Sequence, residues 1–287
     1  MGNSKVDGVL LVDKPEGMTS HDVVAIARRA LGIRRIGHTG TLDPFATGLL
    51  VLLVGGATRL LPYVAGEPKV YDATIRFGTE TDTGDLTGTP IRGAPLPDAA
   101  GVAAGIAALT GRIEQVPPVY SAKQVGGVRA HEAARRGLPL ELRPVLVTVH
   151  SWEMRARRDA DLEVRVVCSG GTYVRALARD LGNLSGSAAH LAALRRLRSG
   201  HFDVSDAVTL EALRAGHTAV MPARAAVSDL PAEQLDERDL ARVAHGQAVR
   251  ATTLGARVAL VGTDGALVAI ADRDGDAWRP RLVLRAV

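Results

Sequence analysis

The carboxylate whose surroundings best suit catalysis is Asp43, a side chain that can serve as a nucleophile. Three nearby glycines, Gly37, Gly40 and Gly48, permit positive φ angles or close approach of another backbone. Pro44 disfavours a helix through Asp43. A rigid polar loop of this kind can hold a catalytic group still, although an Asp before Pro is also a common turn residue that caps its own backbone.

Two further side chains could do chemistry, and each has a structural alternative. Tyr71 falls on the apolar face of the alternating segment 69–78. It is either a core tyrosine with a bonded hydroxyl or an aromatic platform on which a base stacks. Arg175 follows a glycine pair near the expected start of a helix, where it is either a surface cation or part of a site.

Apolar periodicity and turn residues predict the elements that hold these side chains. The run 49–54 predicts a strand buried on both faces, and a strand at 8–15 is expected before a helix capped by Ser20. Two antiparallel strands, 145–152 and 162–168, are expected to be joined through 155–159. The other expectations are helices at 98–110, 130–136, 209–215 and 236–245, a helix from about Thr172, and a helical or tightly turned segment at 189–200.

The pattern of apolar and turn-forming residues changes near Ala225. Three short apolar runs follow, with a turn at 263–265 between the first two, and they predict a small β-rich appendage. These runs are 258–261, 266–271 and 281–284. We therefore expect a first domain over 1–222 and a second over 226–287.

Composition narrows the class of protein. The 287 residues are 46% hydrophobic and 23% charged, with a formal charge of +4, which is compatible with a nucleic-acid partner but weak by itself. Only four of the 35 basic residues are lysines. A single cysteine, Cys168, excludes an intrachain disulfide and fits the core of a protein in a reducing compartment. No long apolar stretch or signal peptide is evident, so we expect a cytoplasmic protein that contacts no membrane.

The segment Gly37-His38-Thr39-Gly40-Thr41-Leu42-Asp43-Pro44-Phe45-Ala46-Thr47-Gly48 resembles the Gly-His-Thr-Gly-Thr-Leu-Asp-Pro-x-Ala-Thr-Gly motif of the TruB family of tRNA pseudouridine synthases. The segments 13–20 and 171–175 also match family motifs, Asp-Lys-Pro-x-Gly-x-x-Ser and Gly-Thr-Tyr-Val-Arg. The resemblance implies the α+β pseudouridine synthase fold, with a mixed, mainly antiparallel central sheet, flanking helices and a small C-terminal PUA-like RNA-binding domain. Because the chain is short at its end, that domain is expected to be a truncated version.

The reaction implied by the resemblance is isomerisation of uridine to pseudouridine at position 55, in the T-arm loop of tRNA. The base must leave its stack and turn over in place. Asp43 would attack either the base or the sugar, and Arg175 would keep the Asp43 carboxylate ionised, with a lowered pKa. No cofactor or metal is needed for this chemistry, and the sequence carries no metal-ligand spacing.

The resemblance also assigns roles to other residues. The catalytic residues are Asp43, Arg175 and Tyr71. The expected substrate contacts are His38, which fills the space vacated by the flipped base, together with Tyr71, Tyr173, Leu194 and Lys14. Tyr173 is a candidate for handling the C5 proton, whereas Lys14 could equally be a solvated residue at a strand end. Basic residues expected to contact RNA are Arg34, Arg35, Arg195, Arg196 and Arg198.

Three hypotheses about function remain at this point. The leading one is a stand-alone, monomeric enzyme that acts on the T-arm stem-loop of tRNA without a guide RNA. The second is a guide-RNA-dependent relative acting in a ribonucleoprotein, against which the short C-terminal domain argues. The third is an RNA chaperone that binds and refolds tRNA without chemistry.

The acidic loop at 81–88 has two carboxylates, each either a turn residue or a group that orients Arg175.

Overall fold

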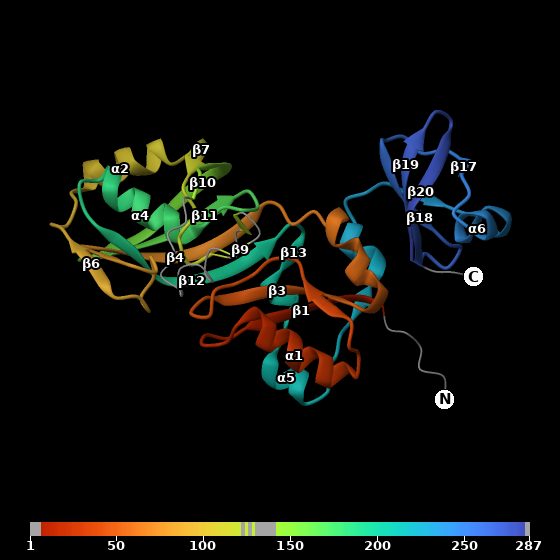
Figure 1. Ribbon diagram of the computed structural model, residues 1–287, viewed down its shortest axis with the longest axis horizontal. Coiled ribbons are helices and arrows are strands. Elements are labelled where there is room, and N and C mark those ends of the chain that lie inside the picture. Colours follow the sequence, from red (N-terminus) through yellow and green to blue (C-terminus); the bar gives the residue numbers. More distant parts are fainter. Residues whose placement is uncertain (1–6, 122–123, 126–127, 130–141, 285–287) are drawn as a thin grey trace. The chain divides into compact units, whose positions relative to one another are not determined.

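The computed structural model describes residues 7–121, 124–125, 128–129 and 142–284 (Figure 1). The chain divides into two compact units. The first contains the residues up to Asp43, Leu50–Ala65 and the residues from Val204 onward; the second contains Pro44–Leu49 and Gly66–Asp203. The expected boundary between residues 222 and 226 lies inside the first unit and stays a prediction.

The first unit opens with strand β1 (Gly8–Lys14), helix α1 (Ser20–Leu31) and strand β2 (Ile36–His38). Strand β2 pairs antiparallel with the end of β3 (Thr47–Val54), whose apolar run is buried as predicted. Apolar side chains of β1 and β3 pack against one face of α1. This core includes Leu10, Val12, Val23, Ala27, Leu50 and Leu52.

Thr19, and not Ser20, caps helix α1. The Thr19 hydroxyl accepts a hydrogen bond from the Asp22 backbone N–H at 3.1 Å, and the Thr19 N–H donates to the Asp22 carboxylate at 2.9 Å. The prediction of Ser20 was wrong by one residue because Thr19 stands at the spacing from Asp22 that allows this reciprocal pair. The bonds from Thr19 also lower the pKa of Asp22. Ser20 is left free to turn inward, where it is buried.

Short elements complete the central part of the first unit. Strand β14 (Val208–Thr209) pairs parallel with β1, and β15 (Met221–Pro222) pairs antiparallel with it. Helix α5 (Leu210–Arg214) confirms the helix expected over 209–215 and packs against α1. The 3₁₀ turns are η1 (Gly55–Tyr63), η2 (Val204–Asp206) and η3 (Ala223–Val227).

The C-terminal part of the first unit is β-rich, as predicted. Its five-stranded sheet has the order β16-β18-β19-β20-β17 and is accompanied by helix α6 (Glu237–Ala244), which begins after its cap Asp236 (Figure 1). The strands are β16 (Ala232–Gln234), β17 (Val249–Arg250), β18 (Arg257–Val261), β19 (Leu267–Asp274) and β20 (Ala277–Val283). Buried Trp278 donates from its indole nitrogen to the carboxylate of buried Glu233 at 2.5 Å, which ties β20 to β16.

The second unit is built on a sheet with the order β12-β4-β11-β10-β7, and these strands pair antiparallel with one another. Strand β12 also pairs parallel with the start of β3. Together with the parallel pair β1–β14, this confirms the mixed, mainly antiparallel central sheet. The sheet strands are β4 (Lys69–Phe77), β7 (Gly111–Gln115), β10 (Val145–Arg158), β11 (Asp161–Cys168) and β12 (Ala189–Ser199).

Two helices cover one face of this sheet (Figure 1). Helix α4 (Val174–Leu184) packs against β12 and β4, and α2 (Ala99–Ala108) packs on α4. The α2 helix confirms the prediction over 98–110. Shorter strands complete the unit: β5 (Thr79–Thr81), β6 (Pro90–Gly93), β8 (Gln124–Val125), β9 (Val128–Arg129) and β13 (Phe202–Asp203). The helix expected over 130–136 lies outside the described residues.

Two sequence predictions in the second unit were wrong. The segment 189–200, expected as helical or tightly turned, forms β12 and is interrupted by irregularities in its pairing with β4. Its Ala, Leu and Arg residues favour helix intrinsically, but cross-strand pairing with β4 overrides that weak preference. Strand β10 continues to Arg158, so that the expected loop 155–159 is mostly strand and the hairpin turns at Asp159, whose φ is 50°.

Candidate active site

The loop that carries Asp43 is fastened to helix α1 through Ser20. The Ser20 hydroxyl accepts a hydrogen bond from the Leu42 N–H at 2.9 Å and donates to the Leu42 carbonyl at 3.1 Å. Both residues are buried, so these bonds are protected from water. The backbone immediately before the half-buried Asp43 is therefore held in place, as the sequence predicted for this segment.

Glycine is required at the end of this segment. Gly48 has a φ of 98°, and a Cβ atom there would lie 2.2 Å from the carbonyl oxygen of Arg196. The close approach arises because Gly48 is paired with Arg196 in the parallel β3–β12 contact. The motif glycine thus lets β12 pack directly against the chain that follows Asp43 and Pro44.

Lys14 is completely buried, which rules out the solvated lysine considered from the sequence. Its ammonium donates to the carbonyls of Pro15 at 2.9 Å and Met18 at 2.7 Å. The ammonium thereby closes the turn between β1 and α1. These contacts favour a role in supporting the site.

His38 ends strand β2, opposite Leu52 of β3. Its ring lies edge-on to that of His21, with the centroids 5.6 Å apart. His38 as a whole is half-buried, and its Nδ1 atom is shielded from solvent.

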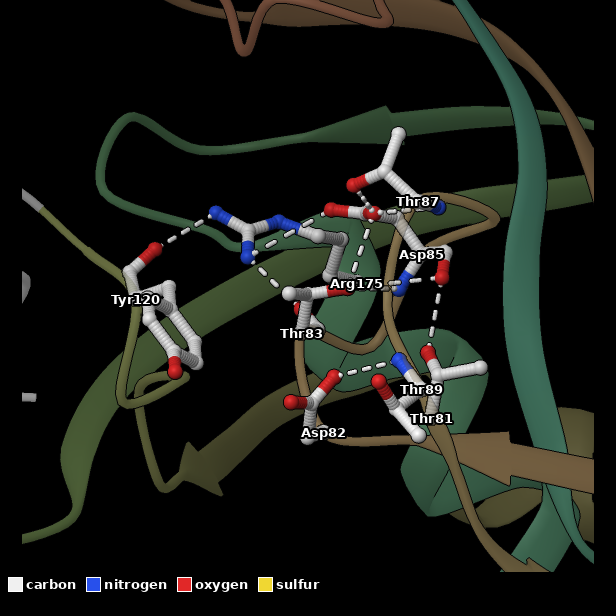
Figure 2. A network of polar contacts seen from close by, with 8 residues as sticks. All are labelled: Thr81, Asp82, Thr83, Asp85, Thr87, Thr89, Tyr120 and Arg175. Atoms are coloured by element: carbon white, nitrogen blue, oxygen red, sulfur yellow. Dashed lines mark hydrogen bonds and ion pairs between the residues drawn. The ribbon is translucent and has the colours of Figure 1, made fainter. Parts of the chain in front are cut away.

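Arg175 forms the centre of a buried polar network in the second unit (Figure 2). Its side chain is 5% exposed, and one terminal nitrogen donates to the Thr83 carbonyl at 2.7 Å while the other donates to the Tyr120 carbonyl at 2.8 Å. The Asp85 carboxylate lies 3.8 Å from the nearer terminal nitrogen. The surface-cation alternative for Arg175 is therefore wrong, because the guanidinium is buried and held from three sides.

The acidic loop supplies Asp85 and fixes it. One Asp85 carboxylate oxygen accepts hydrogen bonds from the Thr83 hydroxyl at 2.9 Å, the Thr87 hydroxyl at 2.6 Å and the Thr87 N–H at 3.0 Å (Figure 2). The other oxygen is the one that faces Arg175. Asp82, by contrast, is an exposed turn residue that accepts from the Thr89 N–H at 2.8 Å. Of the two carboxylates left open by the sequence, Asp85 accompanies Arg175 and Asp82 does not.

Tyr71 lies in the interior of the sheet and is 6% exposed, on the apolar face that its alternation predicts. In register it stands opposite Val166 of β11 and Arg196 of β12. Leu194, 8% exposed, lies opposite Ala73, the next residue on the same face of β4. The structure therefore brings Tyr71 and Leu194 to neighbouring positions of two adjacent strands.

Gln115 is a residue that the sequence analysis did not single out. It is fully buried, and its side-chain oxygen accepts from the Tyr173 N–H at 2.8 Å while its side-chain nitrogen donates to the Tyr173 carbonyl at 3.2 Å. Tyr173 is the residue that precedes α4, so Gln115 fixes the helix start that carries Arg175. Only the fold brings Gln115 and Tyr173 together, because they are 58 residues apart.

We expect replacement of Gln115 by Met to lower turnover about tenfold, because two hydrogen bonds are lost and the start of α4 is no longer fixed. Met keeps the length and packing of the side chain without its polar atoms. Steady-state kinetics should show the loss mainly in kcat. The exposed Gln247 provides a matched control, since Gln247→Met should leave kcat unchanged. A Gln115→Met protein with wild-type kcat would show that this clamp has no role in positioning.

The basic residues expected to contact RNA do not share one environment. Arg34, Arg35 and Arg198 are exposed, and Arg195 is half-buried. Arg196 is 1% exposed and donates to the Leu49 carbonyl at 2.7 Å. Arg196 is therefore not part of the exposed basic surface, because strand geometry turns Arg195 and Arg196 to opposite faces of the sheet, and its contact with RNA stays a prediction without support from exposure.

No group of three or more His, Cys, Asp or Glu side chains in the described ranges could hold a metal ion. Cys168 is buried as expected, and burial raises the pKa of its thiol to about 11. None of the described helices is both long enough and apolar enough to cross a membrane.

Comparison with known families accounts for most of the chain. Residues 28–174 match the model of the N-terminal domain of TruB family pseudouridylate synthases, and residues 175–234 match that of the tRNA pseudouridylate synthase B C-terminal domain. The chain therefore belongs to the TruB family of pseudouridylate synthases, which are isomerases. This membership confirms the resemblance found in the sequence motifs.

Individual relatives agree with this assignment. A protein of Thermobifida fusca named tRNA pseudouridine synthase B is 46% identical over 96% of this chain and 98% of its own length. A protein of the same name from Symbiobacterium thermophilum is 48% identical over 85% of this chain and 84% of its own length.

Solved structures give the same fold. A chain from the crystal structure of a Cbf5–Nop10–Gar1 complex has a TM-score of 0.72 at 25% identity, covering 97% of this chain and 85% of that one. A chain of the archaeal box H/ACA sRNP Nop10–Cbf5 complex has a TM-score of 0.71, also at 25% identity, over 97% and 86% of the two chains. The expected pseudouridine synthase fold is confirmed, and the β-rich C-terminal sheet agrees with the PUA-like prediction.

Proposed function

We propose that this protein isomerises uridine to pseudouridine at position 55, in the T-arm loop of tRNA, without a guide RNA. Within a family of pseudouridylate synthases, the structural observation that carries the proposal is the buried Arg175, held by Asp85 and two carbonyls at the start of α4. Such a fixed guanidinium suits the orientation of a catalytic carboxylate. The tRNA substrate is supported by the name shared by the Thermobifida and Symbiobacterium relatives.

In this proposal Asp43 is the nucleophile, attacking either the base or C1′ of the flipped uridine. The N1–C1′ bond breaks, the base turns over, C1′ bonds to C5, and the bond between Asp43 and the substrate breaks to return the free carboxylate. C5 then loses a proton and N1 gains one, so that no atom is added overall. Arg175 keeps Asp43 ionised and aimed, Tyr71 stacks on the base, and Tyr173 handles the C5 proton.

The remaining contacts follow from the same resemblance. His38 fills the space left by the flipped base, and the Leu194 backbone contacts the uracil. Exposed cations Arg34, Arg35 and Arg198, with the half-buried Arg195, meet the phosphate backbone. Arg196 is omitted from this surface because it is buried.

Release of tritium from uridine labelled at C5 tests the proposal directly, with purified protein and unmodified tRNA as the only macromolecules. Release in the absence of guide RNA is the expected result, because C5 must lose its hydrogen when it bonds to C1′. Binding of tRNA without release would instead support the RNA chaperone hypothesis. Release only after a guide RNA is added would support the ribonucleoprotein hypothesis.

We expect Arg198→Ala to weaken tRNA binding while leaving kcat nearly unchanged. Arg198 is exposed, with its nearest carboxylate, Asp203, at 3.5 Å, so it can turn to a phosphate. The slope of log affinity against log salt concentration should decrease in magnitude by the amount expected for the loss of about one phosphate contact. Arg76→Ala is the control, because two hydrogen bonds to the Asp161 carboxylate hold the Arg76 guanidinium away from a phosphate. Lost turnover with unchanged binding would place Arg198 in the site instead.

A further inference from the structure

Lys69 is a cation that neither the fold nor the proposed chemistry explains. It is the first residue of β4 and shares a face of that strand with Tyr71, two residues further on. Same-face neighbours on a strand are about 7 Å apart. In register Lys69 lies opposite Cys168 of β11 and Ser199 of β12, one step along the sheet from the Tyr71–Arg196 pair.

The ammonium of Lys69 lacks the partners that a half-buried charge normally has. Among the described residues it forms no hydrogen bond and no ion pair. Burial lowers the pKa of Lys69, and the positive charge of Arg196 lowers it further. Cys168 and the Glu67 carboxylate each raise the pKa of Lys69, but by less than Arg196 lowers it, and the Glu67 carboxylate lies against Gly170. Two cations, Lys69 of β4 and Arg196 of β12, therefore lie close enough where β4 begins for one to lower the pKa of the other.

An anion would supply the ion pair that Lys69 lacks among the described residues. A half-buried charge without a partner costs free energy, and an ion pair with good geometry offsets part of that cost. In a nucleotide only the ribose separates the base from its phosphate, so a base stacked on Tyr71 brings a phosphate close to the residue one position along the same face. A lysine ammonium is a compact point charge suited to binding phosphate.

We propose that Lys69 binds a backbone phosphate adjacent to the flipped uridine and so positions the nucleotide on Tyr71. This inference rests on the proposed function, because it requires an RNA substrate whose base enters the site. It assigns Lys69 to substrate binding, a role that the motifs of the sequence do not give it.

The test uses a T-arm stem-loop in which one phosphate, 5′ or 3′ of the target uridine, is replaced by an uncharged methylphosphonate. Binding is measured for Asp43→Asn protein, which holds the RNA without converting it, with and without Lys69→Met. We expect Lys69→Met to weaken binding of the unmodified RNA about tenfold, as for a lost charged hydrogen bond. In the protein that keeps Lys69, one of the two methylphosphonates should weaken RNA binding by a similar factor. In the protein with Lys69→Met, the same methylphosphonate should hardly change RNA binding. The proposal would be overturned if, at both linkages, the loss of affinity from Lys69→Met and the loss from the methylphosphonate simply added together.

Two further variants separate phosphate binding from a structural role. Lys69→Arg keeps the charge, so we expect it to keep the salt dependence of binding, whereas Lys69→Met should lower the slope by about one contact. Arg76→Met removes a charge from the same strand on its other face, and should change neither the slope nor the response to methylphosphonate. If Lys69→Met fails to fold, RNA binding is measured for the Asp43→Asn protein alone. Equal affinity for the unmodified RNA and for both methylphosphonate RNAs would then contradict the proposal.

Failure of this inference is distinguishable from failure of the proposed function. Tritium release by the unmodified protein tests the function and does not depend on Lys69. If release occurs and the methylphosphonate effects are additive, the enzyme assignment stands and the Lys69 contact is wrong. If binding depends on Lys69 and the phosphate but no tritium is released, the RNA site stands and the isomerase proposal is wrong.

Discussion

Asp43→Asn is expected to reduce pseudouridine formation by at least about a thousandfold, because the amide has the shape of the carboxylate but is a far weaker nucleophile. Folding should be nearly unaffected. The backbone before residue 43 is fixed by the two Ser20–Leu42 hydrogen bonds, which the substitution does not touch. Binding of tRNA should also persist, since the exposed cations remain. Single-turnover tritium release, thermal unfolding and filter binding would measure the three properties on the same preparation.

A matched control for this variant is Asp82→Asn. Asp82 is an exposed turn carboxylate whose oxygen caps the Thr89 N–H, and an amide oxygen can accept the same bond. We expect Asp82→Asn to retain turnover within about twofold, as for surface substitutions away from special features. Turnover by Asp43→Asn at the level of this control would remove Asp43 from the mechanism.

Arg175 is expected to give the second-largest effect. Arg175→Ala should impair turnover strongly, but it also leaves the buried Asp85 carboxylate and the carbonyls of Thr83 and Tyr120 without their donor. Breaking such a buried arrangement costs about 3–5 kcal/mol of stability, so part of the loss could come from unfolding. Arg175→Lys is the sharper variant because it keeps the charge.

A lysine at position 175 cannot reach two carbonyls and a carboxylate at once, since its ammonium is a single point charge. We expect Arg175→Lys to fold and bind tRNA but to lower kcat at least about a hundredfold, of the order found when one preorganised charged donor is lost. Arg179→Lys is the matched control: Arg179 lies one turn further along α4, is partly exposed and donates to the Val116 carbonyl at 3.0 Å. Equal kcat for the two lysine variants would contradict a specific role for Arg175.

Much of the fold could be predicted because its signals are local. The alternation at 69–78 and the apolar run at 49–54 identify β4 and β3, and polar caps mark the starts of α2 and α6 at Asp98 and Asp236. Each of these signals acts within a few residues. The mistaken helix at 189–200 shows the limit: β12 is a strand because of its neighbour β4, which begins 120 residues earlier in the chain.

The candidate site divides in the same way. Motif chemistry singled out Asp43, Tyr71 and Arg175 without knowledge of any contact. It could not distinguish Asp85 from Asp82, because both lie in one polar turn and only the position of α4 decides which faces Arg175. It likewise could not separate buried Arg196 from exposed Arg198, since both belong to one run of arginines.

The sequence by itself determined the family, the reaction class and the residue types available for chemistry, because these depend on the order of side chains in short motifs. The tertiary structure alone decided which of those groups are buried, paired or exposed. It showed that Gln115 clamps Tyr173 and that Lys69 lies beside Arg196 without a partner of its own among the described residues. The physical reason is that burial and ion pairing arise from contacts between segments far apart in the chain, and such contacts exist only once the strands have paired.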